Sequence, residues 1–291
     1  MKSSLYVILA GLLWGLISLF IRPLSAAGFS SLQIVMLRMV FSAAILLVFV
    51  LIKDRSLLKI RIKDIWMFIG TGVISIVLFN YCYFKTIIES GASTAVVLLY
   101  TSPIFVTCIS AVLFKERITL QKVIALIMTV TGCVFVAGII GGSAALTPLA
   151  LLTGIGSGLF YALYSIFGRF ALEKYETLTV TVWTFLAASV GSVFIADLPG
   201  SISIIKTQPQ TLLYIIGISS IATVLPYFFY TFGLQKMEAG KAAIIVAVEP
   251  IVGTILGIFA YHESSEPLKV LGIILVISAI LIMNISFGRR R

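Results

Sequence analysis

Residues 99–117 read LYTSPIFVTCISAVLFKER, and residues 246–264 read VAVEPIVGTILGIFAYHES. The second stretch lies 147 positions after the first, and both have proline fifth, isoleucine sixth and glutamate eighteenth. Matches between apolar residues arise easily by chance, but proline and glutamate shared at one fixed offset do not. The two stretches therefore indicate that the chain consists of two related halves.

The same offset relates the two halves over most of their length without a gap. Beyond the apolar matches, the shared residues are Ser18 and Ser165, Arg22 and Arg169, Tyr83 and Tyr230, Pro103 and Pro250, Glu116 and Glu263, and Lys122 and Lys269. This self-similarity predicts a first repeat over residues 1–144 and a second over residues 145–291, joined in one compact domain.

The composition predicts that both repeats lie in a membrane. Of the 291 residues, 60% are hydrophobic and 11% are charged, with a mean hydropathy of +1.16. A soluble domain of this length cannot bury so much apolar surface, so lipid must solvate part of it. Because lipid cannot satisfy backbone hydrogen-bonding groups, each long apolar run is expected to be a helix. Ten such runs are present, over residues 5–22, 31–52, 66–84, 93–114, 120–138, 149–168, 178–196, 211–232, 242–261 and 268–287.

Five helices per repeat is an odd number, so the second repeat must cross the membrane in the opposite orientation to the first. We therefore expect an all-α membrane protein with ten transmembrane helices, arranged as two inverted five-helix repeats. This arrangement recurs among secondary transporters, in which the substrate site lies near the membrane midplane where the repeats meet.

The charges in the predicted loops indicate the orientation of the helices. Basic residues accumulate in alternate loops, and such loops face the cytoplasm. With both termini inside, sixteen basic residues are cytoplasmic: Lys2, Lys53, Arg55, Lys59, Arg61, Lys63, Lys115, Arg117, Lys122, Arg169, Lys174, Lys236, Lys241, Arg289, Arg290 and Arg291. Four face the other side: Arg22, Lys85, Lys206 and Lys269. We therefore predict a multi-pass protein of the cytoplasmic membrane with cytoplasmic N- and C-termini.

Several classes of function lack the residues that they need. The net charge of +10 lies in short loops, without a recognition helix or a basic face with interleaved aromatic residues, so nucleic-acid binding is not expected. The single histidine, His262, has no metal-ligand partner nearby, so no metal site or cofactor is predicted. The absence of a G-x-x-x-x-G-K-[ST] loop excludes direct ATP drive. An intramembrane enzyme and a channel are the alternatives to a carrier, but no nucleophile with a histidine base, charged ring or filter-like loop supports them.

Four groups of residues share the order and spacing of a known transporter family. They are Leu13-Trp14-Gly15, Leu37-Arg38, Leu99-Tyr100-Thr101-Ser102-Pro103 followed by Lys115-Glu116-Arg117, and Glu249-Pro250 followed by His262-Glu263. In these residues the chain resembles the EamA-type branch of the drug/metabolite transporter superfamily over nearly its whole length. The resemblance implies a ten-helix carrier of small metabolites, often an exporter of amino acids or related solutes. The halves differ in that Tyr161 replaces Trp14 and Glu249 replaces Ser102, so they are expected to contribute different chemistry to one cavity.

Two charged residues fall well inside predicted helices. Glu249 lies eight residues after Lys241, or roughly 12 Å along the helix. A charge at such depth costs about 2.5–3.5 kcal/mol unless it meets a partner or water. We therefore expect Glu249 to bind substrate or a proton, which makes proton coupling one hypothesis; the alternative is a structural acid. Arg38 is its natural counter-charge, or else its guanidinium holds a substrate carboxylate.

The other candidates for the substrate site are polar or aromatic residues inside the predicted helices: Asn80, Tyr83, Tyr100, Ser102, Tyr161, Trp183, Tyr227 and Tyr230. Pro103 and Pro250 each remove one backbone hydrogen bond in mid-helix. Freed carbonyl groups persist in a membrane only where neighbours or a wet cavity satisfy them. The two prolines therefore predict a pair of kinked helices that line the site.

Two further features are interpreted as structural. Trp14 lies between Gly11 and Gly15, which form a small-residue face, so its ring is interpreted as a packing device. Glu116 lies among lysine and arginine at a helix end, where a solvated cap or surface pair is expected more often than a gate. The partners that the sequence predicts are a small-molecule substrate and the lipid bilayer, and it predicts no particular oligomeric state.

Overall fold

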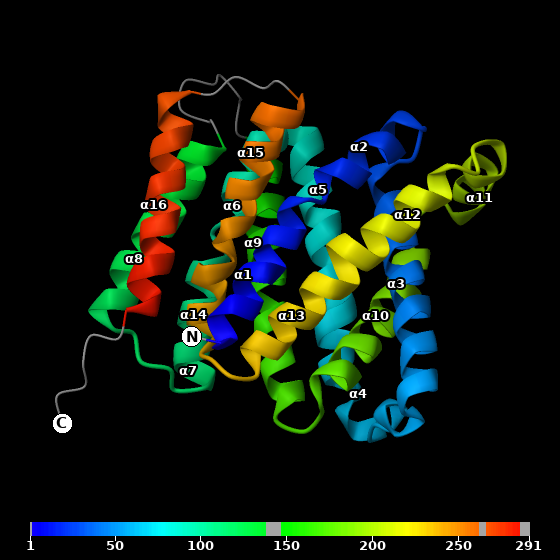
Figure 1. Cartoon of the computed structure of the whole chain (residues 1–291), viewed down its shortest axis with the longest axis horizontal. Helices are drawn as coiled ribbons and strands as arrows, with labels where there is room; N and C mark the ends of the chain where they lie inside the picture. Colours follow the sequence, from blue (N-terminus) through cyan, green and yellow to red (C-terminus); the bar gives the residue numbers. More distant parts are fainter. Residues whose placement is uncertain (1, 138–146, 262–265, 286–291) are drawn as a thin grey trace.

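The computed structural model describes residues 2–137, 147–261 and 266–285, and all regular structure within these ranges is helical (Figure 1). Along the chain the elements are α1 (Lys2–Gly15), α2 (Ser18–Ala26), α3 (Ser31–Lys53), the 3-10 helices η1 (Arg55–Leu58) and η2 (Ile62–Asp64), α4 (Ile65–Ile69), the π-helix η3 (Gly70–Val77), α5 (Leu78–Ser90), α6 (Ala92–Leu99), α7 (Ser102–Leu113), α8 (Leu120–Val136), α9 (Pro148–Leu172), α10 (Thr177–Val193), α11 (Leu198–Thr207), α12 (Thr211–Ser219), the π-helix η4 (Ser220–Val224), α13 (Leu225–Leu234), α14 (Ala239–Ile245), the 3-10 helix η5 (Val246–Val248), α15 (Glu249–Tyr261) and α16 (Pro267–Asn284).

The number of apolar spans is eight or nine within the described ranges. Eight helical segments are long and apolar enough to cross a membrane, and α10 with α11 makes a ninth if this pair, bent by 97°, is one span. The helix α8 is apolar but shorter, with 17 residues. The protein is therefore an all-helical membrane protein with several spans, and the prediction of exactly ten crossing helices is not confirmed. The helix α11 was not predicted, because Pro199 and Gly200 are typical of a loop.

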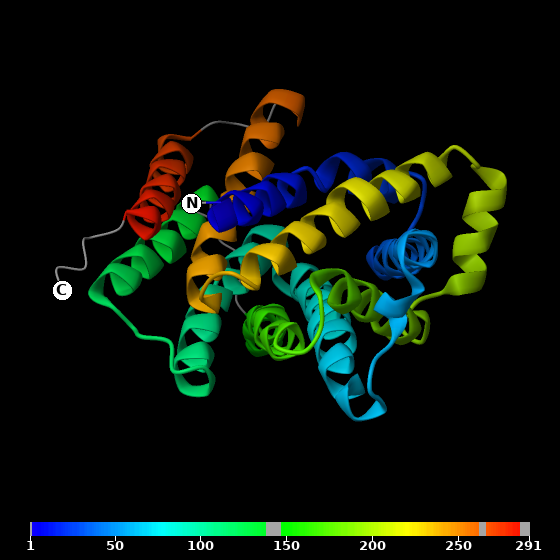
Figure 2. The ribbon, with the colours of Figure 1, turned by 60° about the horizontal axis from the view of Figure 1, so that its bottom comes forward.

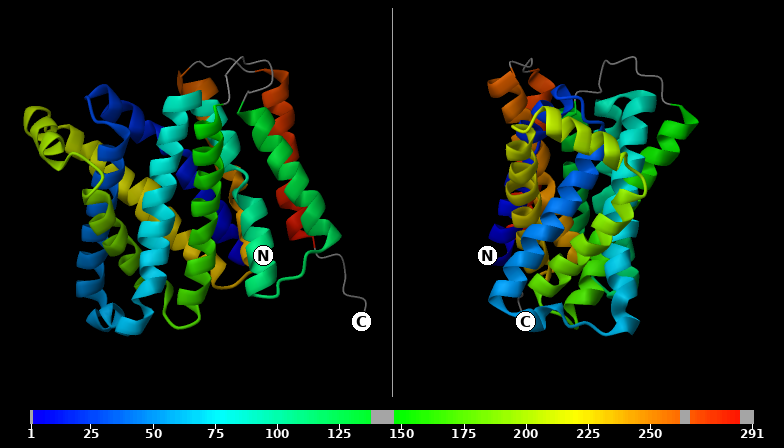
Figure 3. Two further views of the ribbon diagram at one scale, coloured as in Figure 1. Left: turned by 180° about the vertical axis from the view of Figure 1, so that it is seen from behind. Right: turned by 90° about the vertical axis from the view of Figure 1, so that its right-hand side faces the viewer.

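The helices run between two faces of the molecule. The basic face, at the bottom of Figure 1, carries the connections at residues 54–64, 114–119, 173–176 and 235–238, which hold most of the loop lysines and arginines. The opposite face, called the open face below, carries the connections at residues 27–30 and 208–210 and the turn at Gly91. Figure 3 shows the same two faces from behind and from the side.

Segments far apart in the sequence pack side by side between these faces. The helix α1 runs along α13, as Figure 2 shows, and α8 packs along α16. A side chain added to Gly11 or Gly15 would collide with Val248 and Val252, so both glycines let α1 approach η5 and α15 closely. The small-residue face around Trp14 is thus a packing surface, and it fixes the place of the backbone at Glu249.

Two matched positions of the halves depart from regular α-helix. The helix that contains Pro103 is interrupted between α6 and α7, and the one that contains Pro250 passes through η5 before α15 begins. Proline lacks the backbone donor that a continuous helix needs, which explains why each new helical segment begins beside it. The π-helices η3 and η4 end at Val77 and Val224, which are 147 residues apart. Such π-helical turns often occur at functional sites.

Hydroxyl pairs join the helices where lipid excludes water. The Oγ1 atoms of Thr71 and Thr184 lie 2.6 Å apart, between η3 and α10, and both residues are fully buried. The Oγ of Ser42 in α3 donates to the carbonyl oxygen of Ser219 in α12 at 3.1 Å. Because such groups have no water to turn to in a membrane, these contacts hold the helices in one register.

Candidate functional site

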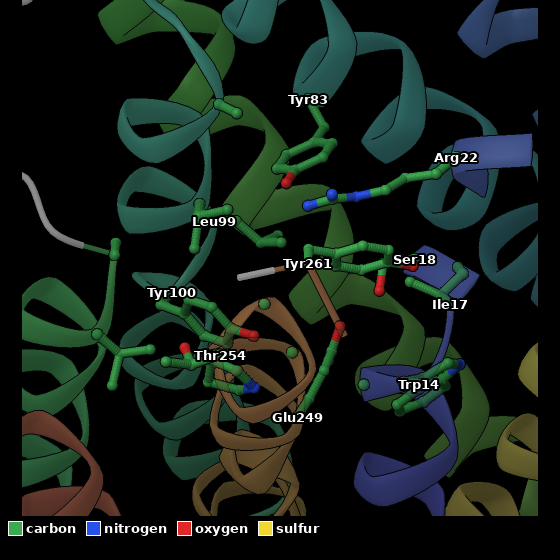
Figure 4. A pocket seen from close by; sticks show the side chains of 18 residues that line it. Trp14, Ile17, Ser18, Arg22, Tyr83, Leu99, Tyr100, Glu249, Thr254 and Tyr261 are labelled. Carbon is green, nitrogen blue, oxygen red and sulfur yellow. The ribbon is translucent and has the colours of Figure 1, made fainter. Parts of the chain in front are cut away.

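One cavity of about 300 Å³ enters the molecule from the open face. Its wall runs from Trp14, in the middle of the molecule, to Arg22, Ala92 and Tyr261, which lie near the open-face ends of α2, α6 and α15. A volume of this size suits a small metabolite. Figure 4 shows the labelled side chains of the wall, which come from α1, α2, α5, α6 and α15 and from the turn at Tyr100.

Glu249 supplies the acidic group of the cavity. It is the first residue of α15, directly after η5, and its carboxylate points into the same space as the hydroxyls of Tyr83 and Tyr100 (Figure 4). The charge of Glu249 is within electrostatic range of both tyrosines and of Tyr161. The cavity thus presents one carboxylate among aromatic hydroxyl groups.

Arg22 places a positive charge near the mouth of the same cavity. Its guanidinium carbon lies 3.4 Å from the centre of the Tyr261 ring, a cation–π contact (Figure 4). The cavity therefore carries an acid toward its floor and a base toward its mouth. Arg22 was expected only as a loop charge, because the sequence near a helix end does not indicate the direction of a side chain.

Trp14 forms the floor of the cavity and the roof of a second, smaller chamber. This chamber has a volume of about 10 Å³, and its wall consists of Trp14, Ser75, Phe79, Tyr161, Tyr164, Ser165, Tyr227 and Tyr230. The ring of Trp14 meets the ring of Tyr227 edge to face at 4.9 Å between centroids. Hydrogen bonds join Ser165 to Tyr230 at 2.7 Å and Tyr164 to Thr231 at 2.6 Å. The space beneath the cavity is thus closed by aromatic packing and hydroxyl pairs.

A cluster of charges, called the basic-face clasp below, lies at the opposite face of the molecule. It consists of Glu116, Lys122, Glu238 and the backbone N–H groups of Ala239 and Gly240. Those two N–H groups donate to the Glu116 carboxylate at 2.7 and 3.2 Å. Lys122, whose side chain is only 3% exposed, lies 3.5 Å from Glu116 and 3.0 Å from Glu238.

The clasp links the first half of the chain, through α7 and α8, to the first turn of α14 in the second half. A carboxylate at the start of a helix also interacts favourably with the helix dipole. The side chain of Glu116 is 6% exposed. The expectation of a solvated cap or surface pair was therefore wrong, because the packing of α14 against α7 covers a residue that the local sequence places in a loop.

A second contact between the two repeats lies on the basic face. Asp64 accepts a hydrogen bond at 2.6 Å from Lys174 and one at 2.7 Å from the Tyr175 hydroxyl. The same hydroxyl accepts from the backbone N–H of Arg61 at 3.0 Å. The loop before α4 is thus tied to the turn between α9 and α10.

Both halves of the chain match one family of known proteins. The pattern that defines the EamA-like transporter family matches residues 1–138 and, a second time, residues 148–285. The chain belongs to the EamA-like transporter family. The resemblance that the sequence motifs indicated is therefore confirmed.

Relatives of this EamA-like protein match it over nearly their whole length. An uncharacterized transporter of Archaeoglobus fulgidus is 26% identical over 95% of this chain and 94% of its own. The uncharacterized inner membrane transporter YicL of Salmonella typhimurium is 25% identical over 99% and 97%. A crystal structure with 17% sequence identity has a TM-score of 0.81 and covers 97% of this chain and 96% of its own, a likeness of fold.

The predicted site residues of this EamA-like chain fall into three groups. Tyr83, Tyr100, Glu249 and Pro250 line the open cavity, while Tyr161, Tyr227 and Tyr230 line the small chamber beneath it. The third group, Ser102, Pro103 and Trp183, lines neither space. Ser102 is only 3% exposed. The indole N–H of Trp183 donates to the carbonyl oxygen of Leu58 at 3.2 Å, near the basic face. Sequence reasoning missed Trp14, Arg22, Thr254 and Tyr261 as cavity residues.

Arg38 and Asn80 line neither space and contact each other. Its Nη2 donates to the Asn80 Oδ1 at 3.5 Å, and the Asn80 amide donates to the carbonyl oxygen of Ile76 at 2.7 Å. Arg38 is 7% exposed, and its Nε has no hydrogen-bond partner among the described residues. It is within electrostatic range of Glu249, but the described residues contain no direct ion pair between them.

Proposed function

We propose that this protein is a secondary transporter of small polar metabolites, amino acids or related solutes, and that it works by alternating access. The observation that carries the proposal is the single acid, Glu249, in a cavity that reaches the open face, while the basic-face clasp closes the opposite side. A carrier needs a site that reaches one side at a time, and this conformation has that form. The transported solute enters or leaves by the open face.

The alternating-access proposal includes an inverted repeat with ten transmembrane helices. The two family matches begin and end 147 residues apart, and the interrupted helices and π-helices obey the same offset. The helices α8 and α10 have 17 residues each, roughly 25 Å at 1.5 Å per residue, which is the lower limit for a span. Counted as spans, they bring the total to ten. Domain boundaries at residues 144 and 145 follow from the same repeat.

The proposed orientation puts the basic face and both termini in the cytoplasm and the open face outside the cell membrane. The support is the accumulation of basic residues at that face. Lys59 and Gln210 are exposed at opposite faces. We expect an impermeant thiol reagent added to intact cells to label Gln210→Cys and to spare Lys59→Cys. Labelling of Lys59→Cys alone would contradict the orientation.

The charges of the cavity support a substrate with an amine and an acidic group. Glu249 is placed to bind the amine, and Arg22 lies toward the mouth with a guanidinium that suits a carboxylate or similar group. The aromatic walls at Tyr83, Tyr100 and Trp14 favour an apolar or planar body between them. Glu249 is also the only described acid in the cavity wall, so proton coupling, if present, takes place there. Export is the proposed direction in the cell.

Counterflow in proteoliposomes tests the proposed activity. Liposomes with the purified protein are loaded with one unlabelled amino acid at millimolar concentration and diluted into the same labelled amino acid. A carrier gives transient accumulation of label above equilibrium. Uptake without an overshoot indicates a channel instead, and no uptake of any of the standard amino acids contradicts the proposed substrate class. Protein-free liposomes give the passive leak.

A further inference from the structure

Two pairs of hydroxyl groups occupy matched positions in the two repeats, but only one pair is joined by a hydrogen bond. Ser165 and Tyr230 are joined by a hydrogen bond of 2.7 Å. Their counterparts 147 residues earlier are Ser18 and Tyr83. Among the described residues, the buried Oγ of Ser18 has no hydrogen-bond partner, so the second pair is not joined. The same two side chains therefore make a bond in one half and leave it unmade in the other.

The surroundings of the two pairs differ in the same way. Ser165 and Tyr230 line the small closed chamber together with Tyr161. Ser18 and Tyr83 line the open cavity together with Trp14, the counterpart of Tyr161. Figure 4 shows the hydroxyl of Tyr83 turned into the cavity, with Ser18 across from it on the wall. Four residues of the chamber, Tyr161, Tyr164, Ser165 and Tyr230, are thus the counterparts of the cavity residues Trp14, Ile17, Ser18 and Tyr83.

We propose that Ser18 and Tyr83 are the gate of the open face, and that their hydroxyls form a hydrogen bond when the cavity closes. In the same movement the bond between Ser165 and Tyr230 breaks, and the basic face opens. This inference rests on the proposed alternating access, because it assigns residues to the second conformation. One hydroxyl pair replaces the other, so the exchange keeps the two conformations close in free energy.

The gate predicts effects of opposite sign for matched substitutions. Ser18→Ala and Tyr83→Phe remove a bond that exists only when the open face is closed, so they favour the present conformation. Ser165→Ala and Tyr230→Phe remove a bond of the present conformation, so they favour the opposite one. One neutral hydrogen bond changes such an equilibrium by about fivefold.

Two threonines at matched positions serve as reporters. Thr254 lines the open cavity, whereas Thr107 is 3% exposed in the closed half. Each is replaced by cysteine in a chain without Cys82, Cys108 and Cys133, the native cysteines. A charged methanethiosulfonate is applied to inside-out membrane vesicles for Thr107→Cys and to right-side-out vesicles for Thr254→Cys. If only a small fraction of the molecules is open at the basic face, the labelling rate of Thr107→Cys is proportional to that fraction.

The expected results separate the gate from the mechanism on which it rests. Labelling at Thr107→Cys slows by about fivefold with Ser18→Ala or Tyr83→Phe, and it accelerates by about fivefold with Ser165→Ala or Tyr230→Phe. The double variant of Ser18 and Tyr83 slows labelling no more than either single variant, because both remove one bond. Retained labelling at Thr254→Cys shows that each variant is folded.

Two results overturn the gate. If only the Ser165 and Tyr230 variants change the rate at Thr107→Cys, the basic face opens without a bond between Ser18 and Tyr83; alternating access then stands and the gate is wrong. If Thr107→Cys is never labelled in any variant while Thr254→Cys is labelled, the basic face does not open. That outcome overturns alternating access and the gate together.

Discussion

The residues that line the open-face cavity and their counterparts 147 positions away, in the other repeat, differ in packing. Glu249 and Pro250 line a cavity, whereas their counterparts Ser102 and Pro103 line neither that cavity nor the small chamber. The local sequence is therefore compatible with both an open and a packed environment. The difference teaches that the cavity is a property of the present arrangement of helices rather than of either repeat alone.

The two halves also differ in the chemistry at that matched position. A serine is inexpensive to bury, whereas a carboxylate in the same place needs water or a partner. Glu249 lines the cavity, whereas Ser102 is buried. The acid thus occupies the matched position that lines the cavity, and its counterpart in the other repeat lines neither space.

Among the substitutions considered for the open-face cavity, removal of Arg38 is expected to reduce transport most. Arg38→Ala removes the positive charge within electrostatic range of Glu249 and the donor to Asn80, and an uncompensated buried charge costs about 3–5 kcal/mol. We expect counterflow to fall at least about a hundredfold. Size-exclusion chromatography should show that the variant still inserts and folds. Arg38→Lys, which keeps the charge, should retain part of the activity, and a normal rate in Arg38→Ala would sink the role of Arg38.

Neutralisation of Glu249 removes the difference in charge between position 249 and its counterpart Ser102. Glu249→Gln has nearly the shape of the protonated acid. If Glu249 carries the proton, downhill exchange continues but accumulation driven by a proton gradient falls at least about tenfold. If Glu249 binds a substrate amine, both activities fall together. Full gradient-driven transport in the variant would make Glu249 a structural acid, and Glu249→Asp is the control that retains the carboxylate.

Weakening of the basic-face clasp is expected to make the basic face open more often. Glu116→Gln keeps the side-chain shape but removes the charge that binds Lys122 and two backbone N–H groups. Hydrogen bonds to a charged group contribute about 1.5–3 kcal/mol, so opening of the basic face should become about ten to a hundred times more frequent. The labelling rate at Thr107→Cys measures this change.

The control for the clasp is Glu89→Gln in α5. Its carboxylate pairs with Lys85 at 3.2 Å within one helix, and both side chains are partly exposed. A pair of this kind contributes little, so the rate at Thr107→Cys should not change by more than about twofold. An equal acceleration by Glu89→Gln and Glu116→Gln would show that the clasp does not hold the basic face closed.

The sequence predicted the position of the helices better than their rotation. Every predicted apolar run contains helix in the structure, because runs of such length have no other stable form in lipid. The helices are apolar on all sides, so periodicity does not show which residues face a cavity. Trp14 was for this reason interpreted only as packing, and Trp183 was expected at the site although its indole binds a loop carbonyl near the basic face.

Charges were the most informative residues for the site. Glu249 was identified from the cost of its depth alone, and the structure places it in the cavity wall. Glu116 was misjudged because it is adjacent to a loop in sequence and is buried only by α14, more than a hundred residues away. Contacts between the halves depend on how the repeats dock, and that information is not local in the sequence.

The smallest expected effect concerns the second contact on the basic face, in which Asp64 binds Lys174 and Tyr175. Tyr175→Phe removes a hydroxyl that donates to Asp64 and accepts from the N–H of Arg61, but Lys174 still holds Asp64 at 2.6 Å. Opening of the basic face should therefore increase only about twofold to fivefold, as expected for one hydroxyl near water. The rate at Thr107→Cys measures it, and Tyr81→Phe, on an exposed side of α5, is the matched control. A change as large as that of Glu116→Gln would mean that the loop before α4, rather than the clasp, sets the balance between the two faces.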